Sequence, residues 1–557
     1  MVRATFSGFN TALSALQANQ KRLDITGQNL SNMNTAGYTR QQLEASSLNY
    51  TNPVSHYSNG NETAVGFGVS MDRVSQIRDP YLDIQYRSQS ADCSYTNRLQ
   101  TALNSLSKVL DETTISGIRQ AFDDIQSTLT SMQDPAKVSD PIYESELRSK
   151  MQSVCNLFNQ ASRQISQAEQ NEFQRLTGEG SSEQGDVQKI NDILRQIGDL
   201  NVQIKRNQVA GHPSLELQDE RNLLLDELSG YIPIETRYYK DDAHSGNNAY
   251  DYDANGAVIG KKDWPDDLEV SMNYIDAQGK SQKLILVNGS DLGADGLTKN
   301  YGQLSVLKGD HQTAASVSDP ANISIKFEKA PSYKGKGQAA ADVYAELKGI
   351  RFEGGSLQAS LDMLQKTGTG NVIKGSTAVD DVRGYQYYSG KLDQLALTFA
   401  KSMNDINNGK NHTDKNLLSN STDDSTNDIT AGNIGISKGW TSGTIHISTD
   451  GTNRTDTVLD MIAAMKDTTK LNGKTFADYM NNLSTQLASD SSSNQTALKT
   501  GTTVLNSIQD SRDSLSGVSL DEEATNMMAY VSAYNAASRL MTALDEVLNT
   551  LISNTGA

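Results

Sequence analysis

Apolar residues recur at alternating spacings of three and four along both ends of the chain. The C-terminal stripe is unbroken and comprises Met527, Tyr530, Tyr534, Ala537, Met541, Leu544, Leu548 and Leu551. The N-terminal stripe contains one polar residue and one glycine and comprises Phe6, Phe9, Leu13, Leu16, Gln20, Leu23, Gly27 and Leu30. This spacing places each set on one helical face. It predicts two long amphipathic helices, the second starting at a capping box of Ser519 and Glu522 after the helix breaker Gly517.

The regions next to these ends also have helical periodicity. Asp79-Pro80 and Asp140-Pro141 each read as an N-cap followed by the first helical residue. Further apolar stripes at helical spacing lie in 99–110, 147–165, 190–204, 217–228, 392–406 and 476–515. We therefore expect a helical body formed by residues 51–230 together with residues 356–517.

The middle of the chain changes texture at about Gly230. Residues 231–355 contain short alternating apolar runs separated by Gly, Asn and Asp, which is typical of strands and turns. The clearest runs are 267–272, 283–287 and 322–327. A polar stretch at 407–433 is predicted to be a loop, followed by a brief strand at 444–448. The sequence leaves open whether 407–450 is a separate small domain.

The predicted fold is therefore mainly α with inserted β. A long-helix bundle or coiled coil is built from both chain ends, and a β-rich outer domain is inserted between them. The periodicity of the ends has two interpretations. The helices can close the domain as an intramolecular coiled coil, or they can fold only when neighbouring subunits cover them.

Charge and composition exclude several classes of function. The chain has 49 basic and 67 acidic residues, a net charge of −18, so its overall field does not favour nucleic acid or an anionic membrane. Its longest apolar runs are a few residues, against the roughly 20 needed for a membrane span. No continuous apolar segment follows Met1, so no cleaved secretion signal is expected. Aromatic residues make up only 6%, which favours long helices over a large enzyme core.

Two fragments imitate catalytic or nucleotide-binding motifs. Gly435, Ser437 and Gly439 fit G-x-S-x-G, but 440–443 is expected to be a turn and the only later histidine is His446. Gly473-Lys474-Thr475 resembles the end of a phosphate-binding loop without its first glycine. We interpret the first fragment as a loop or strand end and the second as a turn before a helix. No catalytic residue is predicted.

The acidic stretch 241–253 contains a fragment of a calcium-binding pattern. Asp251, Asp253, Asn255 and Gly256 match its first positions, but Lys262 stands where a bidentate glutamate belongs. A hairpin with Asn255-Gly256 at its tip, between Tyr252 and Val258, is the better interpretation. Weak calcium binding stays open, and no cofactor or metal site is predicted.

The cysteines and histidines do not suggest a framework or a metal site either. Cys93 and Cys155 are too few for a disulfide framework and fall on predicted helical faces, where burial is expected. The six histidines are scattered without an i,i+4 pair.

The N-terminal segment carries a resemblance to a known family. Residues 12–41, ALSALQANQKRLDITGQNLSNMNTAGYTRQ, resemble the N-terminal signature of flagellar rod, hook and hook-associated axial proteins. In that signature an amphipathic helix precedes a turn, whose positions are here occupied by Asn29, Asn32, Thr35, Gly37 and Tyr38. Asn and Gly tolerate left-handed backbone, which suits the end of a helix.

Three further segments are similar to hook-associated members of this family, in the expected order. They are 65–79 (VGFGVSMDRVSQIRD), 215–228 (LELQDERNLLLDEL) and 516–552, which begins SGVSLDEEATNMM. The resemblance covers the helical flanks and leaves 231–355 unmatched.

The resemblance implies a structural, non-enzymatic axial protein at the hook–filament junction, required for filament assembly and motility. Such a protein would be exported unfolded by the flagellar type III pathway, without a cleaved signal, to the extracellular flagellum. Residues 1–50 with 518–557 would be disordered in the monomer and form the inner tube on assembly. The implied assembly interface comprises Leu13, Leu16, Leu23, Leu30, Asn29, Asn32, Thr35, Gly37, Tyr38, Met527, Tyr530, Tyr534, Met541, Leu544, Leu548 and Leu551.

The implied partners are other flagellar components. They are the hook protein, a second junction protein (hook-associated protein 3) and through it flagellin, further copies of the chain, and an export chaperone at the C-terminal helix. Nucleic acid and membrane are not expected partners. A hook or rod component is the nearest alternative, and a secreted adhesin with its site in 231–355 is a more distant one.

Overall fold

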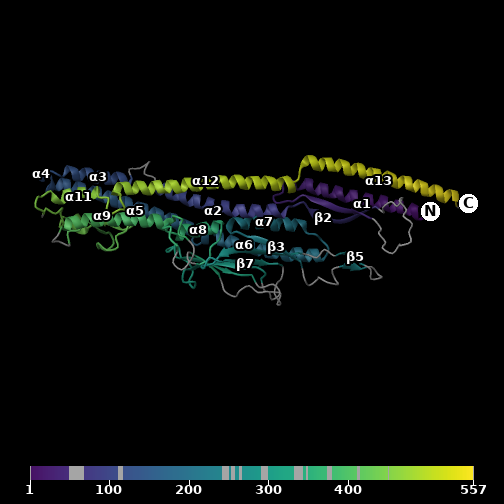
Figure 1. Ribbon diagram of the computed structural model, residues 1–557, viewed down its shortest axis with the longest axis horizontal. Helices are drawn as coiled ribbons and strands as arrows, with labels where there is room; N and C mark the ends of the chain where they lie inside the picture. The colour runs from purple at the N-terminus through teal and green to yellow at the C-terminus, as the bar shows by residue number, and fades with distance from the viewer. Residues whose placement is uncertain are drawn as a thin grey trace.

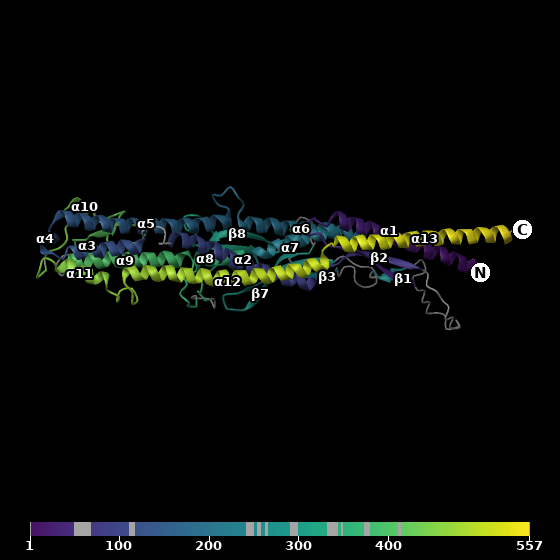
Figure 2. The ribbon, with the colours of Figure 1, turned by 90° about the horizontal axis from the view of Figure 1, so that it is seen from above.

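The protein is a long rod with both termini at the same end (Figure 1). The computed structural model describes residues 2–48, 68–110, 117–240, 250–252, 258–261, 266–289, 299–330, 343–346, 349–372, 379–409, 414–449 and 451–555. Helices run along the rod and the small sheets lie against one side of them near its middle (Figures 1 and 2). This arrangement confirms the mainly α fold with inserted β.

The helices follow the predicted stripes and begin at the predicted caps. Asp140 accepts a hydrogen bond from the Ile142 N–H of α5, and Asp79 accepts one from the Tyr81 N–H at 2.9 Å. Asp134 caps the short helix α4, which was not predicted. The helices are α1 Val2–Ser31, α2 Pro80–Leu110, α3 Ile118–Ser131, α4 Pro135–Val138, α5 Pro141–Thr177, α6 Asp186–Val209, α7 Leu215–Tyr231, α8 Ser356–Gln365, α9 Tyr385–Asn408, α10 Lys438–Ser442, α11 Asp456–Met465, α12 Phe476–Ser516 and α13 Leu520–Thr555.

The strands form small antiparallel sheets. Two have three strands, in the orders β3-β6-β7 and β10-β9-β8, and β1-β2, β4-β5 and β11-β12 are pairs. The three clearest predicted runs lie in β6, β7 and β9, as expected. The strands are β1 Gln41–Ser47, β2 Val69–Gln76, β3 Glu235–Lys240, β4 Tyr250–Tyr252, β5 Val258–Lys261, β6 Asp266–Ile275, β7 Ser281–Asn288, β8 Gln303–Lys308, β9 Ile323–Glu328, β10 Val343–Ala345, β11 Leu418–Asn420 and β12 Ile434–Ile436.

Asparagine side chains fix the inserted sheets to helix α6. The Asn191 amide donates to the Leu304 carbonyl at 2.8 Å and accepts from the Leu304 N–H at 2.7 Å. Asn300 donates to the Gly198 carbonyl at 3.0 Å, and a Cβ at Gly198 would lie only 2.6 Å from Asn300 Oδ1. The close approach requires glycine here, so the β-rich insertion is packed directly on the helical body.

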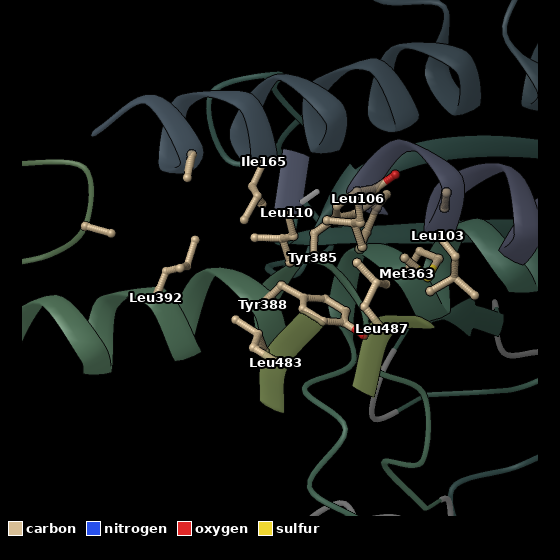
Figure 3. Packing of buried hydrophobic residues seen from close by; sticks show 14 of the residues in the cluster. Leu103, Leu106, Leu110, Ile165, Met363, Tyr385, Tyr388, Leu392, Leu483 and Leu487 are labelled. Carbon is tan, nitrogen blue, oxygen red and sulfur yellow. The ribbon is translucent and has the colours of Figure 1, made fainter. Parts of the chain in front are cut away.

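One apolar core joins the helices and the inserted sheets. Buried residues of α2, α5, α9 and α12 meet around Tyr388, whose ring lies near Leu483 and Leu487 (Figure 3). The same cluster continues into the sheets through Val270 and Phe327. Close packing of this kind fixes the relative positions of the elements.

Several elements differ from the prediction. The predicted turn at 440–443 is largely helix, because Ser437 caps α10 and buried Trp440 anchors it by donating to Glu144 at 2.8 Å. Residues 444–448 do not form a strand, since the Asn407 side chain satisfies their backbone at His446 and Ser448.

Other elements were not predicted at all. The polar stretch 407–433 includes β11, the β1–β2 hairpin had no clear alternating pattern, and α8 lies where helical periodicity was not recognised. Among the helices that the structure describes, none is long and apolar enough to cross a membrane.

Candidate assembly site

The two ends of the chain pair as antiparallel helices. Helix α13 packs along α1, and together they extend beyond the helical body (Figures 1 and 2). Leu544 packs over Gly8, with both Cδ atoms 3.4 Å from the position of a Cβ there. Further along the pair, the Arg22 guanidinium lies 5.6 Å from the Tyr530 ring centre. We call α1 and α13 the terminal pair.

The predicted C-terminal stripe is the face of α13 that meets α1 of the same chain. Its half-buried members are Met527, Tyr530, Tyr534, Met541, Leu544 and Leu548. Leu551 is 49% exposed, whereas Ala537 is buried. On α1, the residues Leu16, Leu23 and Leu30 are half-buried and Leu13 is 46% exposed, whereas the buried residues are Ala12, Ala18, Asn19, Ile25, Thr26 and Asn29. The C-terminal stripe therefore packs against α1 of the same chain, whereas the predicted N-terminal stripe is not the buried face of α1. Their contact with neighbouring subunits stays a prediction.

Asn29 clasps the end of α1 to the first strand. Its side chain is 1% exposed, donates to the Gln41 carbonyl at 3.0 Å and accepts from the Gln41 N–H at 3.0 Å. The Tyr38 hydroxyl donates to the same amide oxygen at 2.9 Å. The amide thus replaces a strand partner for Gln41, and we call these contacts the Asn29 clasp.

The other signature residues shape the turn between α1 and β1. Asn32 donates to the Gln28 carbonyl at 3.0 Å and accepts from the Thr35 hydroxyl at 3.3 Å. Gly37 has φ +77°, a left-handed conformation that disfavours other residues. A Cβ there would lie 3.5 Å from Leu223 of α7. The turn therefore sits directly against the helical body.

Thr39 connects this turn to α7. Its N–H and hydroxyl donate to the two oxygens of Asp219 at 3.0 and 2.6 Å. Burial raises the pKa of Asp219, although both Thr39 bonds favour its charged form. Burial, and then the nearby charge of Asp219, raise the pKa of Tyr38. Its hydroxyl therefore stays protonated and can donate the hydrogen bond to Asn29.

Arg40 joins the N-terminal segment to the helices at the other end of the chain. Its guanidinium pairs with Glu522 at 2.6 Å and Glu523 at 2.8 Å in the first turn of α13. Its N–H donates to the Ser516 carbonyl, the last residue of α12, at 2.9 Å. Arg40 therefore bridges the break between α12 and α13.

Sequence reasoning missed Asp219, Arg40 and Glu523 as site residues. Each looks like an ordinary surface charge, because its partners lie 180 or more positions away in the chain. The nearest available signals were that Arg40 and Asp219 each lie inside a segment similar to the family, 12–41 and 215–228.

The terminal pair presents a second apolar face to the outside. On α13 it has spacings of three and four and every member is exposed; Leu540 and Val547 are 48 and 54% exposed. The outer face comprises Ala529, Ala533, Ala536, Leu540, Ala543 and Val547. Small residues allow another helix to approach closely, and a regular apolar stripe of this kind is uncommon on a solvated surface.

The terminal segments carry little of the chain's charge. Residues 2–48, 68–76 and 517–555 contain six basic and eight acidic residues, a net charge of −2 out of −18. Several copies can therefore bring these segments together with little like-charge repulsion, while the more acidic bodies repel one another.

The imitation motifs have ordinary structural roles. Ser437 donates to the Asn416 carbonyl at 2.6 Å, while His446 pairs with Glu144 at 3.2 Å, so the two do not form a catalytic pair. Thr475 caps α12 by accepting from the Asp478 N–H at 3.1 Å, which confirms the predicted turn before that helix.

The remaining candidates concern metals and cysteines. Strands β4 and β5 pair as the predicted hairpin requires, and its Asn255-Gly256 tip lies outside the described residues. In the described part of the chain, no group of three or more His, Cys, Asp or Glu is placed to hold a metal ion. Cys93 and Cys155 are both buried, as predicted, and burial raises the pKa of the Cys155 thiol to about 12.

Comparisons with known protein families match three parts of the chain. Residues 9–39 match "Flagella basal body rod protein" and residues 511–554 match "Flagellar basal body rod FlgEFG protein C-terminal". Residues 103–263 match "Flagellar hook-associated protein FlgK helical domain". The terminal matches are shared with rod proteins, whereas the match in the body is specific to hook-associated proteins.

Individual relatives agree with these matches. Flagellar hook-associated protein 1 of Bacillus subtilis is 28% identical over 572 aligned residues, which cover 99% of each chain. The protein of the same name from Salmonella typhimurium is 28% identical over 230 residues, 41% of this chain and 38% of that protein.

A solved structure gives a weaker match. The flagellar hook junction protein FlgK from Burkholderia pseudomallei has a TM-score of 0.38 and 19% identity, covering 61% of this chain and 44% of that one. The matches at both ends and in the body, together with the relative that aligns from end to end, make the chain similar along its whole length to flagellar hook-associated protein 1.

Proposed function

We propose that the protein is a structural subunit of the hook–filament junction and that its terminal pair is the element that assembles. The outer face of α13 is the observation that carries this proposal. It is apolar, regular and exposed, and it lies on a nearly uncharged part of an acidic chain. A second copy of the terminal pair is the occupant that fits it. Because such a contact does not have to close on itself, it can build a tube.

The predicted interface residues have two roles in this proposal. Those between α1 and α13 form the terminal pair, and the signature residues around Asn29 fix the pair to the body. Both sets are needed before the outer face has its correct orientation. The outer face then contacts the neighbouring subunit.

The partners and the route to the flagellum are part of the same proposal. The hook protein would lie on one side of the subunit, and hook-associated protein 3 and flagellin on the other. We expect export without a cleaved signal through the flagellar type III pathway. Before assembly, the outer face of α13 offers an export chaperone an amphipathic helix to bind.

A pair of matched substitutions tests the assembly surface. Leu540→Asp places a charge on the outer face, whereas Thr542→Asp places one on the exposed opposite side of α13. In helix propensity, Leu540→Asp costs about 0.5 kcal/mol and Thr542→Asp costs close to nothing, so the two variants differ little in the stability of the helix itself. Cells producing Leu540→Asp should secrete the protein but lack filaments, and Thr542→Asp cells should swim. Equal filament numbers in the two strains would contradict the proposal.

A further inference from the structure

The apolar core ends well before the helical body does. On α12 the last residue of the core cluster is Leu487, and on α2 the first is Leu99. Beyond Leu487, α12 continues to Ser516 without another buried residue, although Leu505 and Ile508 are half-buried. This part of α12 lies along α2 (Figures 1 and 2). Apolar burial therefore contributes little to holding the end of α12.

Side-chain hydrogen bonds hold the first part of this segment. Ser491 accepts from Gln100 at 2.7 Å, and Asn494 donates to the Thr96 carbonyl at 2.8 Å. Neutral hydrogen bonds of this kind contribute modestly in water. The last turns of α12 need a stronger attachment to stay on the body.

Arg512 supplies that attachment one turn before the end of α12. Its Nε lies 3.1 Å from Asp83 of α2, and its Nη2 lies 2.7 Å from Asp226 of α7. The guanidinium stacks over Tyr86 at 4.3 Å from the ring centre. The side chain is only 13% exposed, so water and salt screen these contacts weakly. We call Arg512, Asp83, Asp226 and Tyr86 the Arg512 clamp.

Two further arginines hold the carboxylates of the clamp in place. Arg87 pairs with Asp226 at 2.7 Å, and Arg78 pairs with Asp83 at 2.5 Å. The charges of Arg78, Asp83, Arg512, Asp226 and Arg87 alternate along the row, so each guanidinium faces at least one carboxylate. Charge-assisted hydrogen bonds in such a row are stronger than neutral ones.

The clamp lies where both chain connections leave the body. The first connection runs from β2 to α2 through Ile77 and Arg78, and the second from α12 to α13 through Gly517. Between these connections the Arg40 N–H reaches the Ser516 carbonyl and the Ile77 N–H reaches the Arg40 carbonyl, at 2.9 and 2.8 Å. The end of α1 and the start of α13, far apart in sequence, both lead to this one place.

We infer that the Arg512 clamp is a conformational device that holds the last turns of α12 on α2 and α7 before the terminal pair forms. We call the place held in this way, where the terminal pair joins the body, its base. With the base in place, the end of α1 lies close to the start of α13, so their pairing does not have to close a loop of several hundred residues. Without the clamp, the last turns of α12 separate from α2, and the start of α13 moves away from α1. The inference concerns the body of the free chain and does not depend on the proposed junction role.

Hydrogen exchange of the full-length monomer tests the clamp. In the wild-type chain, amides of 505–516 should be protected. In Arg512→Met, which keeps an apolar stem of similar length and removes the charge, their exchange should speed up at least tenfold. Amides of 476–487, which lie in the apolar core, should not change. Arg195→Met is the matched control, since Arg195 is half exposed and its ion pairs with Asp192 and Asp199 lie within its own helix.

A second variant keeps the test decisive if Arg512→Met destabilises the whole body. Asp83→Asn removes one carboxylate of the clamp, retains its shape and should give a smaller acceleration confined to 505–516. Equal exchange of 505–516 in the wild type, Arg512→Met and Asp83→Asn would overturn the inference. So would rapid exchange of this segment in the wild type, because the base would then not be held.

Discussion

Replacing Asn29 by alanine should weaken assembly far more than replacing Asn32, although both belong to the same signature. Asn29 is 1% exposed and makes three hydrogen bonds. In Asn29→Ala the N–H and carbonyl of Gln41 lose their partners while staying buried. The Tyr38 hydroxyl is half-buried and can turn to water instead.

The structure sets the size of this effect. A buried polar group without a partner costs about 1–3 kcal/mol of folding free energy. The N–H and the carbonyl of Gln41 together, partly rehydrated, should therefore cost about 2–4 kcal/mol. At about 1.4 kcal/mol per factor of ten, this corresponds to a roughly 30- to 700-fold weaker equilibrium. Asn32 makes its bonds at the surface, where water replaces them. Asn32→Ala should therefore cost less than about 1 kcal/mol, below roughly fivefold.

The assay measures incorporation into existing hooks. Purified variant protein is added at graded concentrations to cells that lack the gene, and filaments are counted to find the half-maximal concentration. The terminal segments are expected to fold on incorporation, so the free-energy cost of the broken clasp falls on the incorporation step. The half-maximal concentration of Asn29→Ala should therefore rise by the whole of the roughly 30- to 700-fold factor. Similar half-maximal concentrations for Asn29→Ala and Asn32→Ala would refute the reasoning.

Three further predictions concern the terminal pair and the α2–α12 contact. Hydrogen exchange of the free chain should be fast in residues 8–45 and 520–553, and slow exchange there would show that the pair is already folded before assembly. Leu544→Asp puts a charge against Gly8 and should abolish filaments while leaving the far-ultraviolet circular dichroism nearly unchanged; a loss of most helical signal would place this contact in the stable monomer fold. Gly501→Cys should form a disulfide with Cys93 on oxidation, because a Cβ at 501 lies 3.0 Å from the Cys93 sulfur, and should stabilise the chain by about 2–4 kcal/mol. Free thiols in oxidised Gly501→Cys at the level of the exposed control Thr502→Cys would show that α12 has another register on α2.

Elements with strong local signals could be predicted from the sequence. The stripes of α13 and α5 and the Asp-Pro starts of α2 and α5 act within a few residues, so the chain encodes them locally. The strands β6, β7 and β9 have clear alternation. By contrast, β1 and β2 carry polar residues on both faces, and their pairing depends on α1 and the Asn29 clasp.

The candidate site shows the same division. The signature around Asn29 and Gly37 was recognisable, and its turn role follows from the backbone preferences of those residues. Contacts such as Thr39 with Asp219 or Arg40 with Glu523 join positions 180 and 483 residues apart. The sequence also could not indicate which stripe of α13 meets α1 and which faces outward, because both have helical spacing.

Deleting the gene tests the central claim most directly. Cells without it would be imaged by electron microscopy, and their medium assayed for flagellin. A junction subunit predicts complete hooks without filaments and flagellin shed into the medium. Missing hooks would instead place the protein in the rod or hook, and normal filaments would contradict a role in the flagellar junction altogether.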